Sequence, residues 1–292
     1  KQYKHGETFE AEWINGPITA TVIKDEAIDP AFGTGVMTIT PWHDQADFDI
    51  AERHNLPYEQ IIDWRGKLLP IAGEFAGTNI KDARPKIVEK LQAKGLVEKI
   101  DDAYGHEVPV CYKCEREIGP QVKEQWFVKR APLAERAIAA VKSGEVKILN
   151  ENYEKVLLHW LQNIQDWNIS RQIVWGIPIP AWHRSTDAHD KKDIEWKIQE
   201  ESPGDGWIKD TDTFDTWFSS GQWPFITLGF PDGKDFKTFY PTTVMETGAD
   251  LIFFWVARML MLGLYRTGTV PFACVYLHGM VRDAKGRKMS KS

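Results

Sequence analysis

The sequence of 292 residues contains few cysteines, no excess of positive charge and no long apolar segment. Its cysteines are Cys111, Cys114 and Cys274, so we expect no disulfide framework and a reducing, cytoplasmic environment. Lysine and arginine number 36 against 42 aspartates and glutamates, a net charge of −6, so nucleic acid would have to bind at a local basic patch. The longest apolar run, residues 251–265, contains Arg258 and is shorter than the roughly 18 residues that a membrane-spanning helix needs.

Several common catalytic motifs are missing as well. The sequence has no Gly-x-Gly-x-x-Gly loop, no His-Glu-x-x-His pair and no nucleophile motif around a serine or cysteine. These absences argue against a dinucleotide-dependent oxidoreductase, a zinc-helix protease and a serine or cysteine hydrolase. Tryptophan is abundant by contrast, because 13 tryptophans within an aromatic share of 12% provide large amphipathic side chains for pockets and interfaces.

Residues 104–120 interrupt the periodic patterns on either side with glycines, prolines and a Cys-Tyr-Lys-Cys pair, and therefore indicate a domain boundary. Before this boundary, the alternation over residues 36–40, which Pro41 ends, predicts a half-buried strand. The patterns over residues 44–54 and 81–94 predict helices. The first part of the chain is thus expected to mix α and β structure.

Helices are also predicted after the boundary, over residues 133–142 and 153–165. The charged and poorly periodic residues 187–199 are interpreted as a surface insertion.

A βαβ unit is predicted near the end of the chain. Residues 242–245 and 273–277 have the pattern of buried strands, and residues 250–264 that of a buried helix with Asp250 as its N-cap. A right-handed crossover would place the carboxyl ends of both strands at one edge of a parallel sheet, where open α/β sheets bind ligands. The residues that follow the strands at this edge are Glu246, Thr247, Gly248, His278 and Gly279.

The sequence closes on Lys288-Met289-Ser290-Lys291-Ser292, which places two ammonium groups three residues apart, downstream of the second strand. Lysine is a compact point charge that can stabilise the charge developing on a transferred or departing phosphate. A solvated, frayed terminus is the alternative explanation of the same residues.

Three long sequence motifs favour the explanation in which the lysines meet a phosphate, because they resemble the motifs of a known family. They are residues 166–182, with Asp-Trp-Asn-Ile-Ser-Arg-Gln, Trp-Gly and Ile-Pro-Ala-Trp; residues 215–224, with Asp-Thr-Trp-Phe-Ser-Ser-Gly-Gln-Trp-Pro; and residues 247–259, with Thr-Gly-Ala-Asp-Leu-Ile-Phe-Phe-Trp-Val-Ala-Arg-Met. With the terminal lysine and serine motif, they resemble the class I aminoacyl-tRNA synthetases of the valine, isoleucine and leucine branch. Phe-Phe-Trp at 253–255 and Ile-Thr-Pro-Trp-His-Asp at 39–44 resemble the valine enzymes more than the isoleucine enzymes.

The resemblance covers essentially the whole chain and implies an α/β fold, made of the second half of a Rossmann-like class I catalytic domain and most of an inserted, mixed α/β editing domain. It implies a partial editing domain over residues 1–105, a Cys-bearing connector over 106–125, and a catalytic region over 126–292 that ends at the signature loop. It also implies an ATP-dependent ligase, assisted by Mg²⁺, that joins valine to tRNA(Val).

The resemblance assigns the reacting end of the site to the signature loop. It implies that Lys291 stabilises the pyrophosphate side of the transition state, while Lys288 and Ser290 shape the loop. Trp217 and Trp255 would wall the small aliphatic pocket, in agreement with the rigid apolar walls that a methyl-sized discrimination needs.

The same resemblance implies the adenylate contacts at the predicted sheet edge. Gly248 and Asp250 would hold the ribose of the adenylate. His278 and Gly279 would lie near its adenine.

Apolar walls separate valine from its isostere threonine by only about a hundredfold, for which the valine enzymes are themselves the standard example, so a second, hydrolytic site is needed. The resemblance assigns that site to the first part of the chain, where Asp44 would bind the α-ammonium group of the misattached amino acid. Thr40 and Asp47 would recognise the threonine hydroxyl.

Asp44 and Asp47 could instead be the usual acids of a helix N-terminus, which need no ligand. Thr38 stands where many valine enzymes have lysine, so the site departs from the family pattern.

Cys111 and Cys114 supply half of a tetrahedral zinc site, whereas most zinc-binding members of the family use two cysteine pairs. His106, His183 or His189 could complete the set of ligands. We expect a knuckle without metal.

The sequence is therefore interpreted as an interior segment of a valine-specific enzyme that also edits threonyl-tRNA(Val). The ATP-binding loop of the first half of the Rossmann fold and the Thr-rich segment of the editing pocket are expected upstream of Lys1, and the anticodon-binding helices after Ser292. An isoleucine enzyme, a freestanding editing or tRNA-binding module, and a non-catalytic α/β binding protein are the alternatives.

This interpretation predicts that the 292-residue protein alone does not catalyse valine-dependent ATP–pyrophosphate exchange, because half of the ATP site would be missing. The measurement is the incorporation of labelled pyrophosphate into ATP. Exchange well above the valine-free background would contradict the interpretation.

Overall fold

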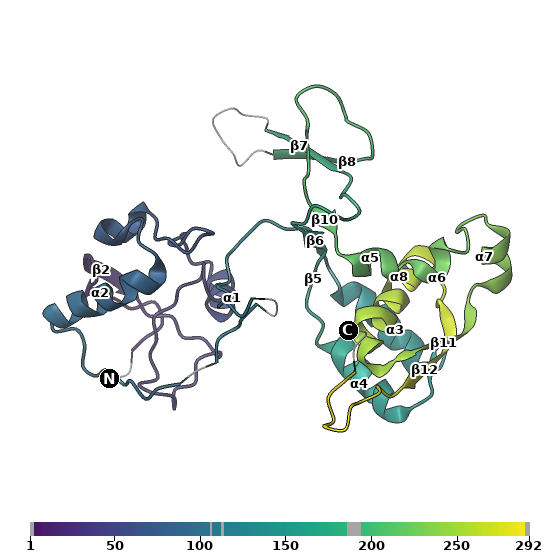
Figure 1. Cartoon of the computed structure of the whole chain (residues 1–292), viewed down its shortest axis with the longest axis horizontal. Helices are drawn as coiled ribbons and strands as arrows, with labels where there is room; N and C mark the ends of the chain where they lie inside the picture. Colours follow the sequence, from purple (N-terminus) through teal and green to yellow (C-terminus); the bar gives the residue numbers. More distant parts are fainter. Residues whose placement is uncertain (1–2, 106, 112–113, 186–193, 290–292) are drawn as a thin grey trace. The chain divides into compact units, whose positions relative to one another are not determined.

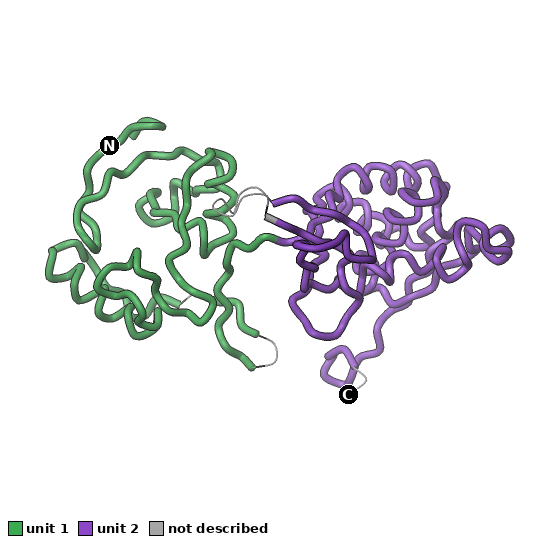
Figure 2. Tube along the Cα trace, turned by 90° about the horizontal axis from the view of Figure 1, so that it is seen from above, with its two compact units in different colours: residues 1–124 green, residues 125–292 purple. Residues whose placement is uncertain are grey.

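The structure is a computed structural model that describes residues 3–105, 107–111, 114–185 and 194–289. It divides into two compact units, residues 1–124 (unit 1) and residues 125–292 (unit 2), coloured separately in Figure 2. Residues 106–124, which the sequence places in a separate connector, fall in unit 1.

Unit 1 combines a β-hairpin with helices, as the sequence predicts for a mixed α and β region (Figure 1). Its described elements are β1 (Thr8–Trp13), β2 (Gly16–Thr21), α1 (Gln45–His54), the 3₁₀ helix η1 (Pro70–Phe75) and α2 (Ile80–Ala93). Leu68, Phe75 and Ala83 form its buried core, against which Ile80 and Ile87 of α2 pack.

Both helices predicted in unit 1 are confirmed, and each begins at a residue whose side chain caps it. Asp44 Oδ1 accepts a hydrogen bond from the Asp47 amide at the start of α1, and Asn79 Oδ1 accepts one from the Lys81 amide at the start of α2. Such a cap satisfies an amide that has no partner within the helix and contributes about 1 kcal/mol. Asn55 ends α1 in the left-handed conformation, with a φ of 50°.

The strand predicted over residues 36–40 is wrong, because the structure has no strand there. Val36 and Met37 are exposed, and the amide of Thr40 donates to Asp47 Oδ2 at 2.7 Å. Alternation of apolar and polar residues describes only the two faces of a strand, whereas a strand also needs a partner for its backbone groups. Within the described part of the chain, this segment pairs with none.

His43 joins the start of α1 to a later segment of unit 1. Its Nε2 accepts hydrogen bonds from the amides of Ile61 at 3.4 Å and Ile62 at 3.2 Å. The pKa of His43 is lowered from its ordinary value, mainly because burial disfavours the imidazolium, while a hydrogen bond to the Pro120 backbone opposes the shift. The folded unit therefore favours neutral His43.

Unit 2 has an α/β architecture (Figure 1). Its described helices are α3 (Ala131–Lys142), α4 (Glu151–Gln162), α5 (Thr216–Ser220), α6 (Trp223–Ile226), α7 (Lys234–Phe239), η2 (Ala249–Leu251, 3₁₀), η3 (Ile252–Val256, π-helical) and α8 (Ala257–Thr267). Its described strands are β3 (Phe127–Val128), β4 (Lys147–Ile148), β5 (Trp167–Asn168), β6 (Ser170–Arg171), β7 (Ala181–Ser185), β8 (Ile194–Ile198), β9 (Ile208–Lys209), β10 (Thr213–Phe214), β11 (Thr242–Gly248) and β12 (Phe272–His278). α3 and α4 confirm the helices predicted over residues 133–142 and 153–165.

The predicted βαβ unit is confirmed. β12 lies between β11 and β4 in a sheet whose pairings are all parallel, and the connection from β11 to β12 runs through η2, η3 and α8. The expectation that Asp250 caps the helix is wrong, because Gly248 is the N-cap of η2 and Asp250 lies within it. The carboxylate of Asp250 pairs with the ammonium group of Lys288 instead of with the helix amides.

The main core of unit 2 lies between the parallel sheet and helices α3, α4 and α8. Its most deeply buried members include Leu157, Leu161, Val256, Leu260 and Val275. Burial of each large aliphatic side chain contributes about 1.5–3 kcal/mol, which fixes the crossover helix against the sheet. Although these helices bury apolar side chains in the core, none of the helices in the described ranges has the length and hydropathy to cross a membrane.

A second sheet, ordered β8-β7-β9, has antiparallel pairings. Residues 194–198 belong to it as β8, so this part of the surface insertion predicted over residues 187–199 is a strand, and most of its residues are exposed. Residues 187–193 lie outside the described residues. Within β8, apolar and charged residues alternate, and this is the strand signal that the interpretation from charge missed.

We expect protons to weaken the contact that His43 makes with residues 61–62. A lowered pKa in the folded state means that the unfolded state binds the proton first, so the stability due to His43 is complete above the unfolded pKa of about 6.5 and is lost as the pH falls towards the folded pKa. Hydrogen-exchange protection factors of the Ile61 and Ile62 amides, corrected for the intrinsic rate, should therefore fall below this pH. His43→Gln should remove the dependence, whereas His159→Gln, at an exposed histidine of unit 2, should keep it. Constant protection from pH 7 to pH 5, values chosen to bracket the ordinary histidine pKa of about 6.5, would contradict the expectation.

Candidate active site

The carboxyl ends of β11 and β12 meet at one edge of the parallel sheet. Gly248, the last residue of β11, lies opposite His278, the last residue of β12. A Cβ atom at Gly248 would lie 2.8 Å from Asp250 Oδ1 and 2.9 Å from Met280 Sδ, so glycine lets these groups approach the strand end closely. The structure thus brings Gly248, Asp250, His278 and Gly279 together, as the sequence predicts for this edge.

Asp250 and Lys288 form an ion pair at this edge, in which Lys288 Nζ donates to Asp250 Oδ2. Their side chains are 50% exposed for Lys288 and 37% exposed for Asp250, so water screens the pair and its contribution to stability is at most about 1 kcal/mol. A ligand that carries hydroxyl or phosphate groups can therefore compete for either partner. Ser290 and Lys291, which are predicted to act with Lys288, lie outside the described residues.

His278 has an oxygen atom next to each of its ring nitrogens. Its Nδ1 lies 2.8 Å from the Gly279 carbonyl oxygen, and because a carbonyl only accepts, Nδ1 carries a hydrogen. Its Nε2 lies 3.3 Å from Glu246 Oε1, and the side chain is 47% exposed. The imidazole therefore presents a fixed, partly open ring beside the strand end.

Asp283 closes the described part of the signature loop, residues 280–289, on itself. Its Oδ1 accepts hydrogen bonds from the amides of Lys285 and Arg287, both at 2.9 Å, and its Oδ2 accepts one from Arg287 Nε at 2.8 Å. These bonds, led by the one from the Arg287 amide, hold the pKa of Asp283 below its ordinary value. The loop that carries Lys288 is thus ordered by the bonds of Asp283.

Trp217 and Trp255 lie on two elements that are tied together. Trp217 is on α5, whose N-cap Asp215 accepts a hydrogen bond from the Trp217 amide at 3.1 Å. Trp255 is in η3, and its Nε1 donates to the carbonyl of Ser220, the last residue of α5, at 3.0 Å. The Trp217 ring also stacks on Phe254, with ring centroids 5.9 Å apart. The structure therefore brings both predicted pocket walls to the junction of α5 and η3.

Sequence reasoning missed a buried charged cluster at this junction. Arg258 and Asp215 are only 8% and 4% exposed. Asp215 Oδ2 lies 2.9 Å from both Trp167 Nε1 and the Arg171 guanidinium, and 3.9 Å from the Arg258 guanidinium, which lies over the Trp167 ring. Burial lowers the pKa of Arg258 to about 10 against the attraction of Asp215, so Arg258 stays charged at neutral pH. The signal in the sequence was a charged residue within the apolar run 251–265.

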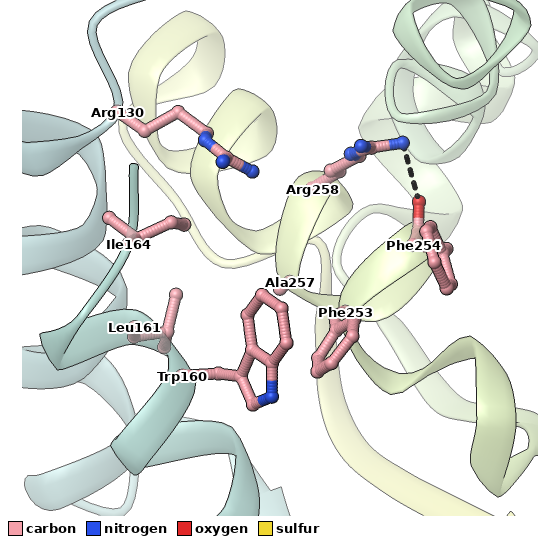
Figure 3. A pocket seen from close by; sticks show the side chains of 8 residues that line it. All are labelled: Arg130, Trp160, Leu161, Ile164, Phe253, Phe254, Ala257 and Arg258. Carbon is pink, nitrogen blue, oxygen red and sulfur yellow. Dashed lines mark hydrogen bonds between the residues drawn. The ribbon is translucent and has the colours of Figure 1, made fainter. Parts of the chain in front are cut away.

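A pocket of about 220 Å³ lies next to this cluster and is smaller than most ligand pockets (Figure 3). Its described lining is apolar apart from two arginines: Arg130, Trp160, Leu161, Ile164, Phe253, Phe254, Ala257 and Arg258. Figure 3 shows Arg130 on one side and the rings of Trp160 and Phe253 on the other. Burial lowers the pKa of Arg130, while the nearby carboxylate of Asp166 opposes the shift. Trp217 and Trp255 are not among the described residues that line this pocket.

Thr40, Asp44 and Asp47 lie together at the start of α1. The amide of Thr40 donates to Asp47 Oδ2 at 2.7 Å, and Thr40 Oγ1 donates to the same oxygen at 3.3 Å. Asp47 is 5% exposed, whereas Thr38, Thr40 and Asp44 are exposed. Asp44 caps α1 through Oδ1, as the explanation without a ligand requires, and this bond uses one of its two carboxylate oxygens.

The described residues offer no complete metal site. None of their clusters contains three histidine, cysteine, aspartate or glutamate side chains arranged to hold a metal ion. Cys111 and Cys114 are cysteines of unit 1, while His183 lies in β7 of unit 2. His106 and His189 lie outside the described residues.

The chain matches one family and a set of longer relatives. Residues 40–292 match the family described as tRNA synthetases class I (I, L, M and V). A valine–tRNA ligase of Symbiobacterium thermophilum is 46% identical over 100% of this chain and 32% of that protein, and one of Thermotoga maritima is 46% identical over 93% of this chain and 31% of that protein. The chain thus spans about a third of the length of these relatives. A solved structure of Mycobacterium tuberculosis methionyl-tRNA synthetase in complex with methionyl-adenylate is similar at 16% identity and a TM-score of 0.44, over 85% of this chain and 46% of that chain.

We expect Asp283→Ala to open the signature loop, because it removes the side chain that accepts from Lys285 and Arg287. Trypsin cleaves after lysine and arginine, so mass spectrometry of a tryptic time course should show several-fold faster cleavage within residues 280–289. Asp232→Ala, at an exposed aspartate of unit 2, should leave that rate unchanged. Equal cleavage of both variants would show that Asp283 does not order the loop.

Proposed function

Because the chain belongs to the class I tRNA synthetases (I, L, M and V), we propose that it is part of a valine–tRNA ligase. Such an enzyme activates valine with ATP and transfers it to tRNA(Val). The observation that carries the proposal is the 46% identity to a valine–tRNA ligase, maintained over the whole chain. The complete activity is attributed to the complete gene product, since the chain spans about a third of that relative.

The edge formed by β11 and β12 is proposed to hold the adenylate. Asp250 would accept hydrogen bonds from the ribose hydroxyls, and the missing side chain of Gly248 leaves room for the sugar next to the strand. His278 and Gly279, at the end of the neighbouring strand, would lie against the adenine. This assignment is supported by the general preference of nucleotides for the carboxyl edge of open α/β sheets.

Lys288 is proposed to exchange Asp250 for the phosphates of ATP. The ion pair is half exposed and weak, whereas the triphosphate offers several negative charges. A carboxylate oxygen of valine would attack the α-phosphorus, and the bond from that phosphorus to pyrophosphate would break. Lys288 and Lys291 would stabilise the charge that builds on the departing pyrophosphate. Mg²⁺ would be bound mainly through the phosphates, as is usual for this ion, and would neutralise part of their charge.

Trp217 and Trp255 are proposed to wall the side chain of valine. The Trp217 ring stacks on Phe254, and the bond to the Ser220 carbonyl holds the Trp255 indole, which supports the role because only rigid walls can exclude one extra methylene group. An isoleucine enzyme would need more room at the same walls and is the alternative within the family.

Unit 1 is proposed to edit threonyl-tRNA(Val). The carboxylate oxygen of Asp44 that the helix cap leaves unused would bind the α-ammonium group of the amino acid. Thr40 and Asp47 would recognise the threonine hydroxyl, which would join or replace the hydrogen bond between them. A freestanding deacylase is the alternative, and it would hydrolyse threonyl-tRNA(Val) although the complete gene product activates no amino acid.

The test measures amino-acid-dependent ATP–pyrophosphate exchange by the complete gene product. Valine should give the highest kcat/KM, with threonine about a hundredfold lower, as in known valine enzymes. Trp217→Ala should lower kcat/KM for valine at least about tenfold, because it removes one wall of the pocket.

The matched control is Trp223→Ala, which removes an exposed tryptophan of the same unit and should change kcat/KM less than about twofold. Higher activity with isoleucine than with valine would overturn the specificity. Equal losses for the two tryptophan variants would overturn the assignment of the wall.

A further inference from the structure

The pocket of about 220 Å³ in unit 2 lies between α4 and the segment formed by η3 and α8. Trp160 belongs to α4, Phe253 to η3 and Ala257 to α8. The volume exceeds that of the roughly 150 Å³ cavity that accepts benzene in an engineered protein core. The pocket therefore has room for a molecule of about the size of one substituted ring.

Arg258, in the wall of this pocket, is a buried cation with few hydrogen-bond acceptors. Its side chain is only 10% exposed. A guanidinium group carries five N–H bonds, but among the described residues only the Phe254 carbonyl accepts one of them, at 3.4 Å. The buried Nε of Arg258 has no acceptor in the described part of the chain. Burying a charge without enough acceptors costs free energy, and a nearby anion would recover part of it.

Positive charge exceeds negative charge around the pocket. Asp215 is 3.9 Å from the Arg258 guanidinium, but the same carboxylate oxygen lies 2.9 Å from Arg171. Asp166 lies beside Arg130 and accepts a hydrogen bond from its backbone amide at 3.2 Å. Three guanidinium groups thus share two carboxylates, and neither carboxylate belongs to the described lining of the pocket.

Arg130 is half-buried and retains donors for a ligand. Its Nε donates to the carbonyl of Gln165, whereas no described residue accepts a hydrogen bond from its two terminal nitrogens. Figure 3 shows both arginines at one end of the pocket and the rings of Trp160 and Phe253 at the other. The pocket therefore has a cationic end and an apolar end.

We propose that this pocket binds a small carboxylate with an apolar body, of about the size of benzoate. The apolar body would contact the rings of Trp160 and Phe253. The carboxylate would accept hydrogen bonds from the terminal nitrogens of Arg130, and the charge of Arg258 would add to the attraction.

The chemistry of the lining distinguishes this ligand from an amino acid. The ammonium group of an amino acid would be repelled by the two arginines and would meet no acid in the described lining. Neither Trp217 nor Trp255 belongs to that lining, and neither do the residues of the adenylate edge. The inference therefore goes beyond the proposed function and does not depend on it.

The ligand class is tested by fluorine NMR titration of para-fluorobenzoate with the 292-residue protein. The fluorine signal should shift or broaden saturably, and unlabelled benzoate should reverse the change. The neutral para-fluorobenzamide has nearly the same shape and should bind at least about tenfold more weakly, because it lacks the charge that the arginines attract.

The cationic end is tested by Arg130→Gln, which should raise the Kd of para-fluorobenzoate about tenfold because it removes a charged donor from the pocket. The matched control is Arg136→Gln, at an exposed arginine of α3 that does not line the pocket. This control removes the same charge from unit 2 and should leave the Kd unchanged.

The apolar end is tested by filling the pocket while both arginines stay in place. Ile164 lines the pocket and is partly exposed, so Ile164→Trp should occupy the space and raise the Kd at least about tenfold. Ile173→Trp, at an isoleucine of the same unit that is 51% exposed and outside the lining, should have no effect. If Arg130→Gln disturbs the fold, the Ile164 variant and the benzamide decide.

Three results would overturn the proposal: no saturable binding by the wild type, equal binding of the benzoate and the benzamide, or equal binding by the pocket variants and their controls. Displacement by valine as strong as by benzoate would also overturn it, since the pocket would then accept an amino acid. Failure of valine-dependent exchange in the complete gene product would overturn the proposed function and leave these outcomes unchanged, so the two failures are distinguishable.

Discussion

The backbone hydrogen bonds that join β11 to β12 in parallel place Gly248 opposite His278, and every contact proposed for the adenylate depends on that register. A shift of one residue would turn the side chains at the strand ends to the other face of the sheet. The register is held by the crossover through η2, η3 and α8, whose buried residues pack against the same strands. Because β11 ends at a glycine, Asp250 and Met280 can both lie close to the strand end, and Asp250 meets Lys288 there. The chemistry proposed for the edge thus follows from strand pairing and from one missing side chain.

The walls proposed for valine depend on a different interaction, the buried carboxylate of Asp215. It caps α5, which carries Trp217, and its Oδ2 lies near Trp167, Arg171 and Arg258. Burying a guanidinium and a carboxylate costs free energy that their attraction recovers only partly, so apolar residues of the same volume would often give a more stable protein. A buried pair of this kind is consistent with a requirement for fixed geometry. The π-helical turn η3, which carries Trp255, has the same implication, since such turns frequently occur at functional sites.

How much of this could be predicted from the sequence depended on the range of the interactions. The helices α1 to α4, the βαβ unit and the gathering of residues at its carboxyl edge follow from local periodicity and strand order, and the structure contains them. The short helices α5, α6 and α7 were not predicted. The strand expected over residues 36–40 failed because alternation does not supply a pairing partner, and Asp250 was misplaced because its partner, Lys288, is 38 residues away. The cluster of Asp215 and Arg258 was not predicted, since it depends on packing between distant segments. The structure brings Thr40, Asp44 and Asp47 together, as expected. The helix cap of Asp44 and the hydrogen bond from Thr40 to Asp47 already use part of the hydrogen-bonding capacity of these carboxylates.

The central claim is that the edge formed by Gly248, Asp250, His278 and Gly279 binds an adenylate. It is tested most directly by a crystal structure of the complete gene product with a non-hydrolysable valyl-adenylate analogue. In that structure the ribose hydroxyls should donate to the Asp250 carboxylate, Lys288 should have left Asp250, and the adenine should lie beside His278. An analogue bound elsewhere, with the ion pair between Asp250 and Lys288 intact, would contradict it.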